Sequence, residues 1–173
     1  MPIVAWEFSE STPTVSAKGL IQGGTLNHGS GKVAVFGEAV SLALLEVARN
    51  ERERYHFVSL LQLETETKAR LRPLLYKYKV SLSENMALGH IDGIVQGYIN
   101  SSWEVFAKAN IQIVEGFLTR FKEIAVVGPD EDREILESMI RHETAIMRWF
   151  DMESRGEKEG SLDGILAELQ YPV

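Results

Sequence analysis

The stretch Met139-Ile-Arg-His-Glu-Thr-Ala-Ile-Met-Arg-Trp-Phe150 decides the fold. Apolar side chains recur in and around it every three or four residues, which is the spacing of one face of an α-helix. At about 100° per residue, Glu143 falls in the middle of this apolar face and His142 at its flank. Burying a carboxylate costs free energy unless it is paired or binds a cation. The stretch therefore predicts a helix that carries a polar site into the core of a helical bundle.

The overall composition indicates one ordinary globular domain. The chain has 173 residues, of which 45% are hydrophobic and 25% are charged. Its net charge of -7 argues against nucleic acid or an anionic membrane as the main partner, because either would require a basic face. There is no signal-peptide pattern and no run of about 18 apolar residues, as a membrane span would need. The chain contains no cysteine, which excludes disulfides and thiolate metal sites. We expect a cytoplasmic protein.

The chain divides into two parts of different composition. Residues 1–31 are rich in Ser, Thr, Gly and Pro, which favour turns, and predict an irregular N-terminal arm. Residues 32–173 predict a helical bundle domain, because long segments of this part consist of good helix formers. The expected helical segments are residues 33–72, 84–125 and 129–155, followed by a short C-terminal helix at 161–169. The predicted fold class is all-α, a bundle of long helices.

Carboxylates also fall on the apolar face of the first helical segment. Glu46, Glu53 and Glu64 lie 7, 11 and 18 residues apart, spacings that return to nearly the same side of a helix. Glu53 and His56 form a Glu-x-x-His pair on neighbouring positions of that face. The alternative interpretation is that these carboxylates lie at the edges of a wide helix and pair with Arg49 or Arg52.

Several core-facing polar residues are predicted to lie at one depth in the bundle. Counting from the turns between segments places Asn110 level with His142 and Glu143. The same count places Asn110 between Glu46 and Glu53 of the first segment. We expect Asn110 and Trp149 to contact a substrate at this level. The expected apolar walls are aromatic: Trp103, Phe106, Trp149 and Phe150.

These residues resemble the inward-facing carboxylates and Glu-x-x-His pairs of ferritin-like, rubrerythrin-type helical bundles. The resemblance covers roughly residues 37–155 and implies an up-down bundle that stores metal or acts as an oxidoreductase. It implies iron or manganese as the cofactor, since both metals suit mixed carboxylate and imidazole ligands. The expected metal ligands are Glu46, Glu53, His56, His142 and Glu143. The chain departs from the family pattern in having one Glu-x-x-His pair and three long segments instead of four.

Two other functions fit the same residues. One is a non-enzymatic structural or interaction protein whose buried Glu–His–Arg network sets the fold and the register of a dimer. The other is a small-molecule-binding bundle with aromatic pocket walls, since such pockets form between helices. Segments of about forty residues would span ~60 Å as continuous helices, which is long for a bundle of this mass. We therefore expect breaks, at Asn50 or near Gly97–Ser102, or extension into a homodimer. Homo-oligomerisation is the predicted assembly.

Overall fold

A computed structural model describes residues 30–79, 88–171 and 173. In these ranges the chain is helical and contains no strand, which confirms the predicted all-α helical bundle. The elements are α3 (Ser30–Glu46), α4 (Glu51–Lys77), α5 (Leu88–Ile99), α6 (Trp103–Val127), the 3-10 helix η1 (Asp130–Asp132), α7 (Arg133–Ser154) and α8 (Asp163–Glu168). The predicted arm lies outside the described residues, except that Ser30 and Gly31 belong to α3.

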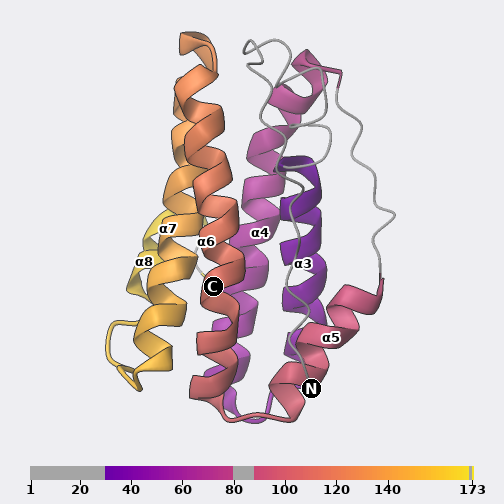
Figure 1. Cartoon of the computed structure of the whole chain (residues 1–173), viewed down its shortest axis with the longest axis vertical. Coiled ribbons are helices and arrows are strands. Elements are labelled where there is room, and N and C mark those ends of the chain that lie inside the picture. Colours follow the sequence, from indigo (N-terminus) through magenta and orange to yellow (C-terminus); the bar gives the residue numbers. More distant parts are fainter. Residues whose placement is uncertain (1–29, 80–87, 172) are drawn as a thin grey trace.

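Two helical hairpins form the body of the bundle (Figure 1). One hairpin packs α3 against α4, and the other packs α6 against α7. The α4 helix also contacts α7, which joins the two hairpins. Helix α5 lies against α3, and α8 covers α7 and contacts α4. Five helices therefore surround one interior space, with α8 outside them.

Both long segments of the sequence break at a helix cap. The Asn50 side chain accepts a hydrogen bond from the Glu53 backbone N–H at 2.9 Å, which starts α4. The Ser102 hydroxyl accepts one from the Val105 N–H at 3.3 Å, which starts α6. The predicted breaks are therefore confirmed at both places. Since the broken helices fit a compact bundle, their length no longer argues for a dimer, and homo-oligomerisation stays a prediction.

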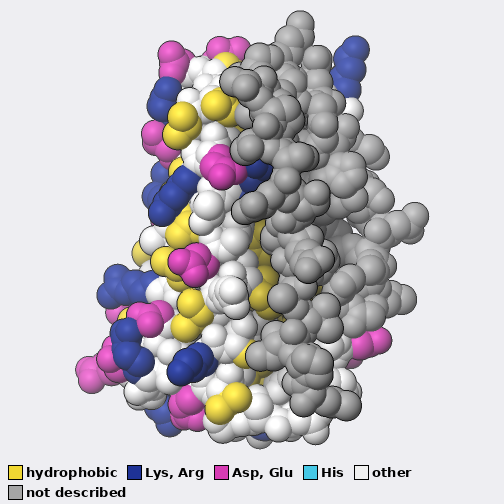
Figure 2. All heavy atoms as spheres, viewed as in Figure 1, with side chains coloured by type: hydrophobic (Ala, Val, Ile, Leu, Met, Phe, Trp, Pro, Cys, Tyr) yellow, Lys and Arg dark blue, Asp and Glu magenta, His cyan; other side chains and the backbone are white. Residues whose placement is uncertain are grey.

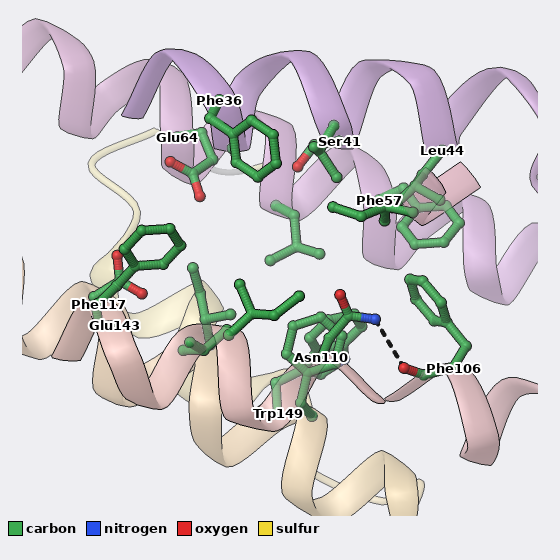
Figure 3. Close-up of a pocket in the computed structure, with 18 residues that line it drawn as sticks. Phe36, Ser41, Leu44, Phe57, Glu64, Phe106, Asn110, Phe117, Glu143 and Trp149 are labelled. Atoms are coloured by element: carbon green, nitrogen blue, oxygen red, sulfur yellow. Dashed lines mark hydrogen bonds between the residues drawn. The ribbon is translucent and has the colours of Figure 1, made fainter. Parts of the chain in front are cut away.

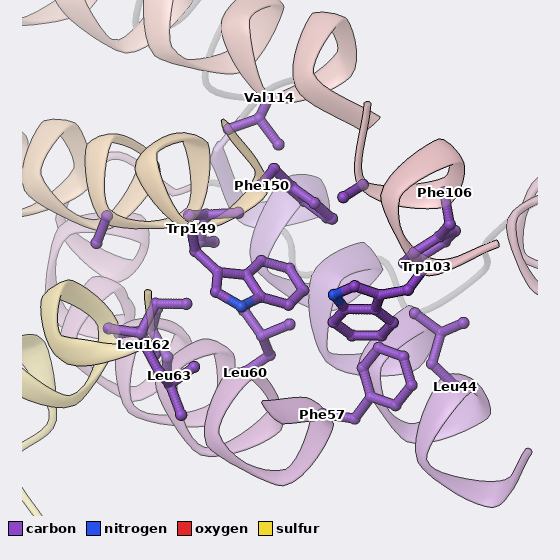
Figure 4. Close-up of a cluster of buried hydrophobic side chains, with 14 of the residues drawn as sticks. Leu44, Phe57, Leu60, Leu63, Trp103, Phe106, Val114, Trp149, Phe150 and Leu162 are labelled. Atoms are coloured by element: carbon purple, nitrogen blue, oxygen red, sulfur yellow. The ribbon is translucent and has the colours of Figure 1, made fainter. Parts of the chain in front are cut away.

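A polar layer divides the apolar core into two clusters. The larger cluster, drawn in part in Figure 4, surrounds Trp149 and Phe57 at the end of the bundle where α4 begins. The smaller cluster lies further along the same helices and comprises Leu71, Leu74, Leu75, Phe121, Ile124, Leu136 and Met139. Between them, both α4 and α7 place polar side chains in the core: Glu64, Thr67, His142 and Glu143. Such a layer requires internal partners, because burial removes these groups from water.

The surface carries charges of both signs. Figure 2 shows Lys and Arg side chains interspersed with Asp and Glu over the described part of one face, so this face is not a continuous basic surface. Within the described ranges, every helix is too short or too polar to cross a membrane.

Candidate functional site

An acid–imidazole–acid cluster occupies the polar layer. His142 of α7 is 1% exposed, and its Nδ1 atom lies 3.0 Å from the Thr67 hydroxyl of α4. The opposite ring nitrogen, Nε2, lies 3.4 Å from Glu64 Oε1 and 3.8 Å from Glu143 Oε1. Glu143 is 3% exposed, so it and His142 face inward, as their positions on the apolar face of α7 predict. The imidazole therefore stands between two carboxyl groups from different helices.

Burial and mutual charge set the protonation of this cluster. Burial alone would lower the pKa of His142, but the charge and contact of Glu64 outweigh it and raise that pKa. Burial raises the pKa of Glu143 to about 8, with the Glu64 charge adding to the effect and His142 opposing it. The raised pKa of His142 favours an imidazolium beside Glu64, and Glu143 is mainly protonated at neutral pH.

One carboxylate oxygen of the cluster has no partner. Glu64 Oε2 is buried and forms no hydrogen bond with any residue that the structure describes. Gly37 of α3 covers the same carboxyl group, since a Cβ atom added to Gly37 would lie 2.3 Å from it. The missing side chain thus lets α3 approach the carboxylate and hold it in place. An unsatisfied buried acceptor is rare in proteins and requires an explanation.

Replacing Gly37 with alanine is expected to lower the free energy of unfolding by about 1–3 kcal/mol. The new methyl group forces the Glu64 carboxyl away from His142, which outweighs the gain of up to about 1 kcal/mol that alanine brings to a helix. Gly116→Ala is the matched control, because that helical position on α6 is exposed and open to a methyl group, and it should stabilise the protein. Urea unfolding of both variants measures the difference. Equal stabilisation by both substitutions would show that Glu64 is not held by Gly37.

A cavity of about 90 Å³ adjoins the cluster (Figure 3). Residues of α3, α4, α5, α6 and α7 line it. Most of the lining is apolar, and the aromatic members are Phe36, Phe57, Phe106, Phe117, Trp149 and Phe150. The polar residues of the lining are Ser41, Glu64, Asn110 and Glu143. Figure 3 shows both carboxyl groups at one end of the cavity and Phe106 with Leu44 at the other. The cavity is therefore apolar with one acidic end.

A second buried network surrounds Glu153 of α7. Glu153 is fully buried and accepts hydrogen bonds from Arg52 at 2.5 Å, from the Trp103 indole and from the Ser161 hydroxyl. Burial would raise the pKa of Glu153, but these donors outweigh it and lower that pKa. Because its lone pairs already have donors, Glu153 acts as a structural tie between α4, α6, α7 and the segment before α8.

His56 lies next to this network as a neutral ring. Burial, reinforced by the charge of Arg52, lowers the pKa of His56 to about 4. Its Nδ1 atom accepts a hydrogen bond from the Trp149 indole at 2.8 Å, which places the proton on Nε2. The 3.9 Å approach of Nδ1 to Glu153 is consequently not an ion pair at neutral pH. His56 thus fixes the Trp149 ring, which forms part of the cavity wall.

Glu53 belongs to a third set of contacts, at the junction of α3, α4 and α5. Its carboxylate accepts hydrogen bonds from the Tyr98 hydroxyl and from Arg49 Nε, the latter at 2.9 Å. The Arg49 guanidinium also lies 4.3 Å from the centre of the Tyr98 ring. Burial would raise the pKa of Glu53, but these hydrogen bonds outweigh it and lower that pKa. Glu53 is thereby satisfied by the protein itself.

The five predicted metal ligands are not brought together. The inward position predicted for Glu46 is wrong: its side chain is exposed, because α3 buries the side that carries Ser41 and Leu44, and Glu46 lies on the other side of the helix. Glu53 and His56 belong to separate networks, apart from His142 and Glu143. No set of three His, Asp or Glu side chains within the described ranges is arranged to hold a metal ion. These residues do not fit the di-metal centre that the resemblance implies.

Other positions were only partly foreseen. Asn110, which counting from the turns places level with Glu143, lines the same cavity as Glu143. Trp149, the other predicted substrate contact, also lines it. Glu64 was placed on the apolar face of its helix, but nothing in the sequence paired it with His142. Glu153 was missed, although the spacing of three to four residues that leads to Glu143 continues through Phe150 to it.

A helical bundle by itself does not define a function, because unrelated functions share such folds. The features of this bundle that bear on function are therefore the cavity and its acidic end. No protein-family model, curated protein or solved structure matches the chain.

Proposed function

We propose that the protein is a small-molecule-binding helical bundle whose ligand occupies the cavity between α3, α4, α5, α6 and α7. The observation that carries this proposal is that Glu64, one of the residues that line the cavity, has a buried Oε2 atom with no hydrogen-bond partner among the described residues. A ligand with a hydrogen-bond donor would satisfy that atom and fill the space beside it. Apolar cavities with a few polar groups at defined places are the usual form of small-molecule sites.

The surroundings of Glu64 favour ligand binding over a purely structural role. In the Glu153 network the buried carboxylate is met by three donors of the protein, as structural carboxylates require. Glu64 instead keeps one buried oxygen without a hydrogen-bond partner among the described residues, and the residue lines the cavity. Glu153 and Glu64 thus differ in whether donors of the protein satisfy the buried carboxylate. This difference favours a ligand in the cavity beside Glu64.

The cavity volume sets the size of the ligand. An engineered protein cavity of about 150 Å³ holds benzene, so a cavity of about 90 Å³ suits a body of roughly four or five carbon atoms. For so few atoms, ligand efficiency allows a dissociation constant of about 0.1–1 mM. Suitable probes are therefore four-carbon compounds such as 1-butanol and n-butylamine.

Titration calorimetry with these two probes tests the proposal. We expect at least one of them to bind with a stoichiometry of one, and a Val114→Leu substitution to weaken binding about fivefold or more by filling the cavity. Val126→Leu adds the same methylene group at an exposed position of the same helix and should leave binding unchanged.

The proposal would be contradicted if neither probe bound. It would also be contradicted if the Val114→Leu and Val126→Leu variants bound the probes equally well. Elemental analysis of the protein purified without added metal distinguishes small-molecule binding from the metal-binding hypothesis. One equivalent or more of iron or manganese would favour the metal-binding hypothesis.

A further inference from the structure

We infer that the cavity takes a ligand bearing a protonated amine, which Glu64 and Glu143 hold from opposite sides at the acidic end. This inference rests on the proposed function, because it names the chemical class of the ligand in the same cavity. It follows from the kinds of polar atom that face the cavity, from the rings beside them and from the local balance of charge.

The polar atoms available to a ligand are mainly acceptors. The Glu64 carboxylate lines the cavity and its Oε2 has no partner among the described residues, and a carboxyl oxygen of Glu143 accepts a hydrogen bond in either protonation state. The Asn110 amide donates one of its two N–H groups to the Phe106 carbonyl oxygen at 2.8 Å, which leaves the amide oxygen and one N–H for a ligand. An ammonium group carries three N–H donors and no acceptor, which complements such a set.

The rings at the acidic end also favour a cation. Phe36 and Phe117 line the same cavity as Glu64 and Glu143, and Figure 3 draws these two rings in the same part of the view as the two carboxyl groups. The negative face of an aromatic ring attracts ammonium groups, most strongly where water is excluded. The remaining walls are apolar and suit the hydrocarbon body of a small amine.

The charge balance disfavours an anionic ligand. The cation of the cluster, His142, faces Glu64 through Nε2 and Thr67 through Nδ1, and it is not part of the cavity lining. A carboxylate or phosphate entering the cavity would meet two acidic side chains and no cationic one in its lining. In a desolvated site the Glu64 carboxylate repels an anion strongly, and the mainly protonated Glu143 supplies no positive charge to offset this repulsion. An amine is the ligand class that these contacts favour.

The test compares three probes of equal length on the wild-type protein: n-butylamine, 1-butanol and butyrate. A charged hydrogen bond strengthens binding by about 10- to 100-fold, so n-butylamine should bind that much more tightly than 1-butanol, and butyrate should not bind. Titration calorimetry at neutral pH and low salt measures all three.

Two variants assign the effect to the acidic end. Glu64→Gln should remove most of the preference for n-butylamine and change 1-butanol binding by less than about threefold. Glu143→Gln resembles the protonated acid, so it should weaken n-butylamine much less than Glu64→Gln does at neutral pH. Glu137→Gln, on the exposed face of α7, removes the same charge away from the cavity and should change nothing. The comparison of the three probes needs no variant, so it decides the question even where a substitution impairs folding.

The outcomes separate this inference from the proposed function. Equal affinity for n-butylamine and 1-butanol would overturn the amine inference and leave small-molecule binding intact. Binding of neither would overturn both. Saturable binding of MnCl2 that excludes n-butylamine would overturn the amine inference and identify the acidic end as a metal site.

Discussion

A Glu153→Leu substitution is expected to lower the free energy of unfolding by about 3–5 kcal/mol. Glu153 is fully buried and receives hydrogen bonds from Arg52, the Trp103 indole and Ser161. Leucine keeps a similar volume but accepts nothing, so the buried Trp103 indole loses its partner at about 1–3 kcal/mol. The Ser161 hydroxyl also loses Glu153, but it keeps the Lys158 carbonyl oxygen as an acceptor at 3.2 Å and so adds less. Arg52 is 34% exposed in its side chain and turns to water, so it adds less.

Urea unfolding at pH 7 measures this loss. Glu153→Gln should lie between wild type and Glu153→Leu, because the amide keeps one acceptor oxygen. The matched control is Glu157→Leu, whose exposed carboxylate pairs with Arg155 and whose removal should leave stability close to that of wild type. A loss of under 1 kcal/mol for Glu153→Leu would show that the network does not tie the helices together.

Periodicity and capping residues carry much of the fold. The apolar face of α7 placed His142 and Glu143 inside, because a side chain in the middle of such a face is buried whatever helix packs on it. Asn50 marked a break because an asparagine side chain satisfies the free N–H groups of a helix start. Both predictions depend only on the geometry of a single helix, so the sequence of that helix is enough to make them.

The candidate site depends on how helices sit against each other, and this is harder to predict. Treating residues 33–72 as one continuous helix places Glu46 on the same side as Glu53 and Glu64, but α3 and α4 are separate helices and α3 turns Ser41 and Leu44 inward instead. The pairing of Glu64 with His142 requires the rotation and register of α4 against α7. The role of Gly37 requires the closeness of α3 to α4. None of these quantities follows from the period of a single helix.

The pH dependence of stability is the second large effect, and its sign follows from the buried cluster. Burial raises the pKa of Glu143 to about 8, from 4.5 for an ordinary glutamate. The folded protein thus keeps this proton to a higher pH than the unfolded chain does. Its contribution to stability is fully present below pH 4.5 and is lost as the pH rises to 8. The pKa of His142 is also raised, above its usual 6.5, so its contribution is likewise lost on the alkaline side.

Carboxylates of lowered pKa act in the opposite direction. Glu53 and Glu153 contribute stability that is present above about pH 4.5 and is lost as the pH falls through their lowered pKa values. His56 acts in the same direction as these carboxylates, because its pKa falls from 6.5 to about 4 on folding and its contribution to stability rises with pH between those values. This rise offsets the loss from Glu143 up to about pH 6.5, so stability should be nearly constant from about pH 5 to pH 6.5. Above pH 6.5 the free energy of unfolding should decrease toward pH 9, with ~2 kcal/mol from Glu143 at 1.36 kcal/mol per pKa unit and a further part from His142.

Urea unfolding followed by circular dichroism between pH 5 and pH 9 measures this decrease. A Glu143→Gln variant stays neutral throughout, so the decrease should shrink to the part that His142 contributes, and the variant should be more stable than wild type at pH 9. Glu137→Gln, which removes a carboxylate from the exposed face of the same helix, should keep the wild-type pH profile. If wild type were more stable at pH 9 than at pH 5, or if Glu143→Gln kept the full decrease, Glu143 would be ionised in the folded protein. The acidic end of the cavity would then carry two negative charges at neutral pH, which would strengthen the binding of a cation there and the repulsion of an anion.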